Sequence, residues 1–156
     1  MLGIAYCFNG EMDAARKALI RTMELAPEWD QYAFLLAVID LLQGDPAKAL
    51  ARYEQMSIGW VWLTGLALAE HDLGHASKSN RALAALIRGH AGDSPYQIAQ
   101  VYAYRRELDR AFEWLERAYA LPDTGLIHVK SDPLLRNLRG DPRYRALLRK
   151  MNLPLD

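Results

Sequence analysis

The sequence predicts an all-α protein, built from antiparallel helical hairpins and closed by short helices at its C-terminal end. Three observations carry this prediction. Between the breaks, apolar residues recur at helical spacing, and no segment alternates apolar and polar residues as a strand does. The breaks follow one another at regular distances. Acidic or hydroxyl residues precede proline at 45–46, 94–95, 132–133 and 141–142, a pattern typical of helix starts.

The hairpins share one order of large and small residues. In the first, large Leu2 and small Gly3 precede a turn at Asn9-Gly10, and small Ala15 and large Leu19 follow it. Small side chains mark the places where helices approach closely, and large ones fill the holes between them. The corresponding small residues are Gly3, Ala37, Ala67 and Ala99 in the first helices, and Ala15, Ala49, Ser79 and Ala111 in the second. The steps along the second set are 34, 30 and 32 positions.

The later breaks fix the remaining elements in order. They fall at Gly44-Asp45-Pro46, at Leu73-Gly74-His75 and at Arg105-Arg106-Glu107. The pattern predicts helix pairs over residues 1–25, 29–57, 60–89 and 94–121, inside repeats at about 1–29, 30–59, 60–91 and 92–121. Residues 122–156 are expected to form a helical cap, with helices starting at Asp132-Pro133 and Asp141-Pro142. One domain is expected over residues 1–156.

A period near 34 residues, with this order of small and large positions, resembles the tetratricopeptide repeat. The resemblance covers residues 2–121 and is strongest in the first and last copies. The middle copies have Asp40 and Glu70 where the others have Tyr6 and Tyr102. The segment HVKSDPLLRNLRGDPRYRALLRKMNLP (128–154) is similar to the end of such arrays in bacterial multidomain regulators, which carry cyclase, winged-helix or kinase domains. The resemblance implies a short right-handed α-solenoid, in which stacking of the hairpins supplies the core.

Composition is that of a globular protein, with 51% hydrophobic and 24% charged residues. Lys and Arg together number 19, as do Asp and Glu, so overall charge does not favour nucleic acid or an anionic membrane. The single cysteine, Cys7, excludes an internal disulfide and a cysteine-rich metal site. No segment resembles a signal peptide or a membrane span. We therefore expect a cytoplasmic protein that needs no cofactor.

Candidate catalytic groups are few. His71 and His75 have the spacing of metal ligands on one helix face, but Gly74 interrupts the helix and no third ligand accompanies them. Asp40 and Glu70 occupy equivalent places and could form an acid–base pair. The alternative is that they face solvent or pair with an arginine. Phosphate-binding glycine loops and nucleophile motifs are absent, so the sequence predicts no enzymatic activity.

The C-terminal segment is basic. Between Val129 and Lys150, seven basic residues oppose only Asp132 and Asp141. Such a face could bind phosphates as a nucleic-acid adaptor, although it is more often solvated or covers apolar surface with its arginine stems. No nucleic-acid motif accompanies it, so we do not expect nucleic acid as the partner. The basic residues are Lys130, Arg136, Arg139, Arg143, Arg145, Arg149 and Lys150.

The resemblance further implies that the first helix of each hairpin lines a concave groove that binds a partner. Carried over residue by residue, the groove consists of Ile4, Phe8, Phe34, Leu35, Val38, Leu41, Leu42, Val61, Leu68, Tyr96, Gln97, Gln100 and Tyr104. None of these is Lys, Arg or Asn, so a clamp for a partner's C-terminal carboxylate is not expected. Most are apolar and need a cover. A partner segment, a second copy of the chain or its own C-terminal helix could cover these side chains. Alternatively, the stack of hairpins could curve tightly enough to bury them in the core.

The function that these observations predict is non-catalytic protein–protein interaction through this groove. One alternative is a module that senses a small molecule or peptide in a closed pocket of Phe34, Val38 and Tyr96. The other is the basic nucleic-acid adaptor.

We expect the protein to form a homodimer. The first hairpin lacks the front half of its first helix, which leaves an uncapped end, and Trp60 and Trp62 add aromatic area. Light scattering over a dilution series should give twice the chain mass, and Phe34→Glu should give a folded monomer. A parent that is monomeric at every concentration would contradict the prediction.

Overall fold

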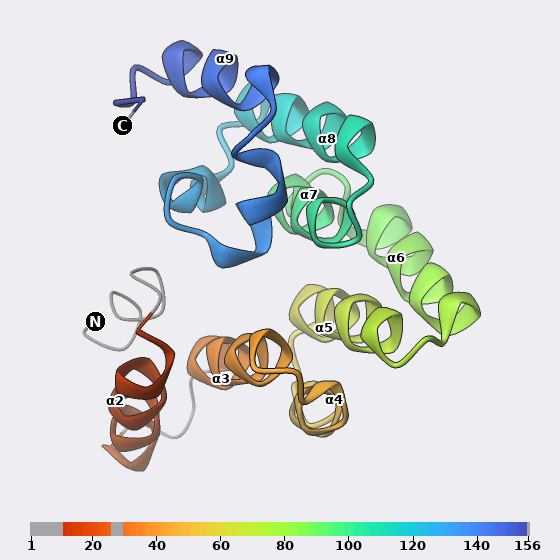
Figure 1. Cartoon of the computed structure of the whole chain (residues 1–156). Coiled ribbons are helices and arrows are strands. Elements are labelled where there is room, and N and C mark those ends of the chain that lie inside the picture. Colours follow the sequence, from red (N-terminus) through yellow and green to blue (C-terminus); the bar gives the residue numbers. More distant parts are fainter. Residues whose placement is uncertain (1–10, 26–29, 156) are drawn as a thin grey trace. The chain divides into compact units, whose positions relative to one another are not determined.

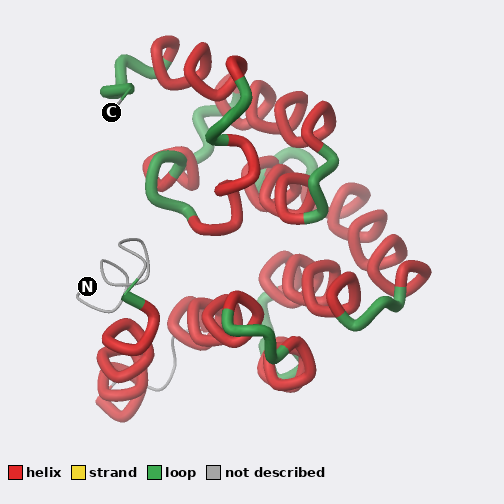
Figure 2. Tube along the Cα trace, in the orientation of Figure 1, coloured by secondary structure: helices red, strands yellow, loops and turns green. Residues whose placement is uncertain are grey.

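The computed structural model describes residues 11–25 and 30–155, and all regular structure among them is helical (Figures 1 and 2). This confirms the all-α prediction for the described residues. Ile4, Phe8 and the first predicted helix lie outside them. The α-helices are α2 (Met12–Leu25), α3 (Asp30–Leu42), α4 (Pro46–Tyr53), α5 (Gly59–Asp72), α6 (Ala76–His90), α7 (Pro95–Tyr104), α8 (Leu108–Ala120) and α9 (Pro142–Lys150). Two 3-10 helices, η1 (Thr124–His128) and η2 (Pro133–Leu138), precede α9.

Three of the four proline-marked helix starts are capped as the sequence predicts. The side chain of Asp45 accepts a hydrogen bond from Lys48 N at 3.1 Å, and α4 begins at Pro46. Asp132 and Asp141 cap η2 and α9 in the same way, through the N–H groups two residues further along. A carboxylate at this position satisfies an N–H that the first turn leaves without a partner.

The start of α7 is different. Ser94 precedes Pro95, yet its side chain makes no capping hydrogen bond. The N–H of Tyr96 is bonded instead to Asp123 Oδ2 at 3.0 Å, and Asp123 lies in the turn before η1. A side chain distant in sequence therefore supplies the cap that the local pattern assigned to serine.

Three helices end in the same turn, at the breaks that the sequence predicts. In each turn, a carbonyl near the end of the helix accepts a hydrogen bond at 2.9 Å from the N–H of the residue five positions further along. These carbonyls belong to Asp40 in α3, Glu70 in α5 and Tyr102 in α7. Such a turn needs one residue with positive φ, which glycine adopts without steric cost. Gly44 (φ 83°) and Gly74 (φ 77°) fill this position in the first two turns.

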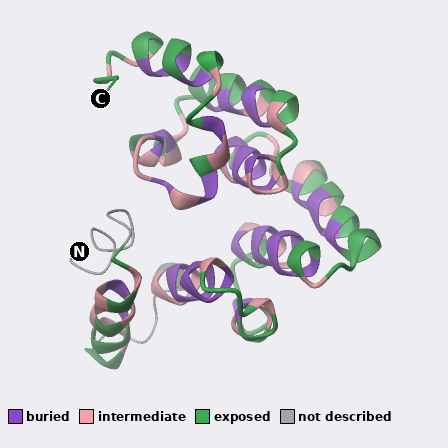
Figure 3. Cartoon of the chain, in the orientation of Figure 1, coloured by how far each residue is buried: buried purple, intermediate pink, exposed green. Residues whose placement is uncertain are grey.

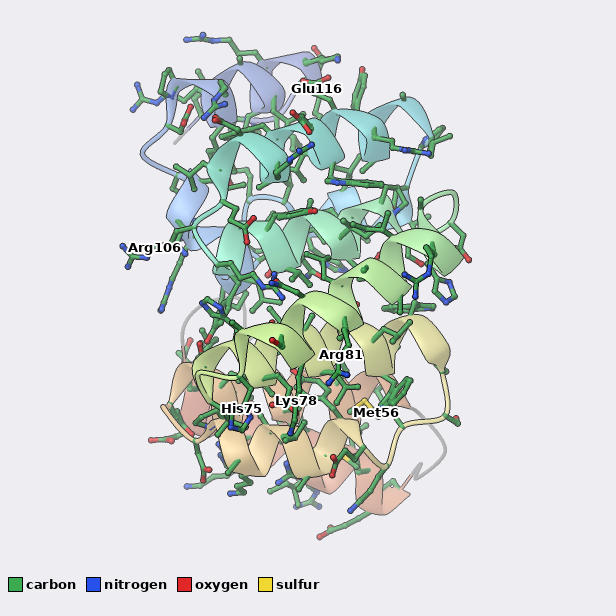
Figure 4. All side chains as sticks on the ribbon, turned by 90° about the vertical axis from the view of Figure 1, so that its right-hand side faces the viewer. Met56, His75, Lys78, Arg81, Arg106 and Glu116 are labelled. Carbon is green, nitrogen blue, oxygen red and sulfur yellow. The ribbon has the colours of Figure 1, made fainter. Side chains whose placement is uncertain are left out.

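Arg106 fills the position in the third turn, with φ 63°, where a side chain is sterically disfavoured. Its side chain is exposed and projects from the chain (Figure 4), so the strain is confined to the backbone. Helices α8 and α9 end in the same way, so what the three hairpins share is the placement of the turn after their first helix.

The chain divides into two compact units, residues 1–89 and 90–156, and each is described here by itself. The prediction of a single domain stays a prediction. In the first unit, α2 packs on α3 through a core of Ala15, Leu19, Leu35, Leu36 and Ile39. In the second, α7 packs on α8, and η2 lies against α7. The buried residues follow the sides of the helices that face their neighbours (Figure 3).

The small residues that the repeat pattern selects are almost completely buried where the structure describes them, and Gly3 lies outside the described residues. Their exposed fraction is at most 1%, and the set consists of Ala15, Ala37, Ala49, Ala67, Ser79, Ala99 and Ala111. The hydroxyl of Ser79 in α6 donates a hydrogen bond to the carbonyl of Ala67 in α5. These positions are therefore where neighbouring backbones come close together, as their side-chain size predicts.

Gly65 in α5 is a further point of close approach, and it yields a test of the packing. A Cβ atom there would overlap the ring of Tyr53, which is fully buried in α4. We expect Gly65→Ala to lower the free energy of unfolding in urea by about 1–3 kcal/mol, because the helices must separate to admit the methyl group. Gly89→Ala in α6 is the matched control, since a Cβ there meets nothing within 4 Å. Its effect should stay below about 1 kcal/mol. Equal losses in both variants would contradict the tight contact.

Candidate functional site

The structure buries most residues of the predicted groove. Phe34 is half-buried, and its ring centroid lies 5.8 Å from that of Tyr53 in the α3–α4 pair. A charge at this position would thus disturb helix packing as well as any interface. Binding of a partner through these residues stays a prediction. Buried members are Leu35, Val38, Leu41, Val61, Leu68, Tyr96 and Gln100, while Phe34, Leu42, Gln97 and Tyr104 are half-buried.

In the last hairpin, the chain's own C-terminal segment covers the predicted groove. Tyr96 Oη and Gln100 Nε2, both on α7, donate hydrogen bonds to Asp132 Oδ2 at 2.8 and 2.6 Å. The other oxygen of Asp132 accepts a hydrogen bond from the N–H of Leu134, in the first turn of η2, at 2.8 Å. Asn137 in η2 adds a bond to the carbonyl of Ala103 in α7. Two of the side chains that would face a partner in this copy, Tyr96 and Gln100, thus bind the capping residue of η2.

The environment of Asp132 perturbs two titrations. Burial raises the pKa of Asp132, and the hydrogen bonds from Gln100 and Tyr96 offset only part of that rise. Burial, followed by the nearby charge of Asp132, raises the pKa of Tyr96 well above its usual range. The carboxylate accepts hydrogen bonds from the side chains of Tyr96 and Gln100 and from the N–H of Leu134, and these bonds offset only part of the cost of burying it.

Asp40 and Glu70 each have their own basic partners in the structure. Asp40, buried in α3, lies 2.7 Å from Arg16 of α2 and 2.6 Å from Arg52 of α4. The alternative expectation, pairing with an arginine, is therefore what the structure has at Asp40. The side chain of Glu70 lies 2.6 Å from His75 Nδ1 and 3.4 Å from Lys78 Nζ. Asp40 thus links three helices, whereas Glu70 links α5 to the start of α6.

The histidine pair does not form a metal site with its neighbours. His71 and His75 are both exposed, and His75 is engaged with Glu70. In the part of the chain that the structure describes, no group of three His, Cys, Asp or Glu side chains is arranged to hold a metal ion.

A cleft of about 410 Å³ lies between α4, α5 and α6, and we call it the α4–α6 cleft. Its apolar wall includes Trp62, whose side chain is 39% exposed. Figure 4 shows Lys78 and Arg81 beside one another on α6, next to α4. Arg81 is exposed and makes no ion pair with any described residue. The lining residues are Glu54, Trp62, Leu63, Leu66, Glu70, Lys78, Arg81, Ala82 and Ala85.

The sequence marks Trp62 only as additional aromatic area and does not place it in a site. The i, i+4 spacing of Trp62 and Leu66 was the available signal, because it puts both on one face of α5. The contributions of α4 and α6 have no signal in the sequence, since they depend on how three helices pack.

Two members of the basic C-terminal segment are neutralised. Arg143 lies 2.7 Å from Asp109 and 2.8 Å from Asp141, and its guanidinium carbon is 4.4 Å from the ring centre of Phe112. The ammonium of Lys150 pairs with Glu116. These two cations connect α9 to α8 and are occupied by that contact.

No protein-family model, curated protein or solved structure matches this chain. Within the described residues, no helix combines the length and the apolar character needed to cross a bilayer. The tetratricopeptide resemblance therefore depends on the residues and turns named above.

The raised pKa of Asp132 predicts a specific pH dependence of stability. Above the unfolded value of about 3.9, the folded state retains a proton that the unfolded chain has released, so rising pH disfavours folding until the folded pKa is passed. We expect the stability of the parent, relative to Asp132→Asn, to fall as pH rises through this window. Urea unfolding between pH 4 and 7 measures the difference.

Asp141→Asn is the matched control, because Asp141 also caps a helix before proline. Hydrogen bonds from Arg143 lower the pKa of Asp141, so its contribution should have the opposite sign and be lost as pH falls. If the Asp132 difference stayed constant or rose with pH, burial would not control its titration.

Proposed function

We propose that this chain is a non-catalytic protein-interaction module of the tetratricopeptide type, which binds a segment of a partner protein in the α4–α6 cleft. Its hairpins would stack as a short right-handed solenoid. Two features support this architecture. The turns after α3, α5 and α7 share one hydrogen-bond pattern, with carbonyls from Asp40, Glu70 and Tyr102. The small residues of the repeat pattern are buried where the helices meet.

The single observation that carries the binding site is the exposed indole of Trp62 within an apolar cleft. Tryptophan is among the residues that contribute most to binding when a partner covers them. The cleft volume of about 410 Å³ lies in the range of clefts that enclose ligands or partner side chains. Leu63, Leu66 and Ala85 are half-buried beside Trp62, so apolar area remains that an apolar side chain would cover.

The charges around the cleft indicate the chemistry of the partner. The ammonium of Lys78 is already close to Glu70 at 3.4 Å, whereas Arg81 has no acidic partner among the described residues. A carboxylate on the partner would pair with Arg81. The proposed occupant is therefore a short amphipathic segment with an apolar side chain against Trp62 and an acidic residue against Arg81. Because the helices are preformed, ordering costs on the side of this chain are small.

Peptide selection on the immobilised full chain tests this proposal. We expect the enriched peptides to combine apolar and acidic residues. Fluorescence anisotropy should show that Trp62→Ala weakens their binding by about thirtyfold, the loss typical of an interface hot spot. Arg81→Glu should weaken only those peptides that carry the acidic residue, because it repels their carboxylate.

Ile20→Ala is the matched control, since Ile20 is 43% exposed on α2 and does not line the cleft. Enriched peptides that bind Trp62→Ala as tightly as the parent would contradict the site. If Trp62→Ala instead converts a dimer to a monomer in light scattering, the occupant is a second copy of the chain. Trp62 suits that measurement better than Phe34, because Phe34 packs against Tyr53.

A further inference from the structure

The side of the α4–α6 cleft that α5 supplies is as long as two turns of a helix. Trp62 lies in the first turn of α5, and Glu70 is eight residues further along, which a helical rise places about 12 Å away. Leu66 lies four residues from each of them, so all three share one side of α5. This side of the cleft is therefore apolar from Trp62 to Leu66 and becomes charged at Glu70.

The side that α6 supplies combines small and basic residues. Ala82 is buried and Ala85 is half-buried, and neither side chain extends far from the backbone. Lys78 and Arg81 each lie four residues before one of these alanines, on the same side of α6. A neighbouring backbone can therefore approach α6 closely at the alanines, while its side chains reach the two cations.

The apolar character of the cleft decides the backbone conformation of its occupant. A bound segment loses water from its N–H and C=O groups, and each group left without a hydrogen bond costs free energy. Apart from the indole of Trp62, the polar side chains of the described lining are Glu54, Glu70, Lys78 and Arg81.

These side chains do not satisfy an extended backbone. Glu70 is already bonded to His75, and Glu54, Lys78 and Arg81 are exposed rather than placed along the apolar part. The lining elements are helices, which use their backbone groups internally and offer no strand edge for pairing. A helical segment forms its backbone hydrogen bonds within itself, so it alone fits an apolar cleft without this cost.

The charges on opposite sides of the cleft differ in sign. Glu54 follows the end of α4 and is exposed, and it has no basic partner among the described residues. Arg81 on α6 has no acidic partner among them, and it lies beside Lys78 next to α4 (Figure 4). A segment with a basic residue toward Glu54 and an acidic residue toward Arg81 would balance both charges.

We infer that the partner segment in the α4–α6 cleft is an amphipathic α-helix whose two flanks carry opposite charges. Its apolar stripe lies on Trp62 and Leu66, its acidic flank faces Arg81, and its basic flank faces Glu54. This inference rests on the function proposed above, to which it adds the conformation of the segment and the role of Glu54.

Two peptide libraries of identical composition test the conformation. Both consist of leucine, alanine, glutamate and lysine in segments of about 16 residues, a length at which a helix can form on binding. One library places leucine at the i, i+3, i+4 and i+7 positions of a helix, and the other alternates leucine with polar residues. Selection on the immobilised full chain should enrich the helical library about tenfold more than the alternating one.

NMR of an isotope-labelled peptide from the enriched pool provides a second readout. When the peptide is bound to the full chain, its Cα chemical shifts should be those of a helix across its leucine positions. Fluorescence anisotropy should show that Trp62→Ala weakens its binding by about thirtyfold, which places the bound helix in this cleft.

Glu54→Lys tests the basic flank of the partner helix. It should weaken binding of the enriched peptides by about fivefold, because the new ammonium repels the lysine that faces this position. Replacing that lysine of the peptide with glutamate should restore binding to the variant. Glu24→Lys is the matched control, since it makes the same change of charge at an exposed residue of α2 that does not line the cleft.

Three results would overturn the inference. The first is a set of Trp62-dependent binders from the alternating library alone, which would make the occupant extended and leave the proposed function intact. The second is an equal effect of Glu54→Lys and Glu24→Lys. The third is a dimer of the bare chain that Trp62→Ala converts to a monomer, because a second copy would then occupy the cleft. If neither library yields a peptide whose binding depends on Trp62, the proposed function fails as well, so the two failures are distinguishable.

Discussion

The rest of the structure depends on the close approach of helices at small residues. Ala15, Ala49, Ser79 and Ala111 each occupy the equivalent place in a second helix, and each is at most 1% exposed. A larger side chain at such a place would separate the helices and open the core, at a cost typical of overpacking. Tyr53 shows the complementary half of this arrangement, because its ring fills the space that Gly65 leaves in the next helix. The α4–α6 cleft lies beside this contact and depends on its geometry.

Buried carboxylates fix how neighbouring helices are positioned, because apolar contacts alone allow one helix to shift along another. Asp40 binds arginines from the helices on either side of it, so a shifted helix would leave a buried charge without its partner. Asp132 has the same role between η2 and α7, where it accepts hydrogen bonds from Tyr96, Gln100 and the N–H of Leu134. Burial raises the pKa of Asp132, because its hydrogen bonds do not fully offset the loss of hydration.

The two clefts differ because the chain distributes its charges unevenly over its surface. The α4–α6 cleft is mainly apolar and mixes acidic with basic residues. A second cleft, of about 230 Å³ within residues 90–156, is lined by Lys130, Arg139 and Arg145 together with Tyr144, Leu148 and Leu155. Arg143 and Arg145 make the contrast within one helix, since the first reaches Asp109 of α8 and the second lines the cleft.

The sequence by itself determined the helices and the turns between them. Asp45-Pro46, Asp132-Pro133 and Asp141-Pro142 act within a few residues of themselves, and so do the glycines at 44 and 74. Because these caps and turn glycines act over a few residues, the local sequence is enough to predict them. The repeat pattern also selected the small positions that the structure buries, because side-chain size limits helix approach wherever the helix lies.

Only the tertiary structure decided which side chains meet. Ser94 before Pro95 matches the sequence pattern of a helix cap, yet its side chain makes no capping hydrogen bond. The N–H of Tyr96 is bonded instead to the side chain of Asp123, in a turn distant in sequence. The sequence assigns Tyr96 and Gln100 to a groove and leaves its cover undecided, whereas in the structure both side chains bind Asp132 at the start of η2. Nothing in residue type separates Arg143, which is paired, from Arg145, which lines a cleft. Contacts of this kind join residues far apart in sequence, and their energies depend on the packed geometry rather than on local order.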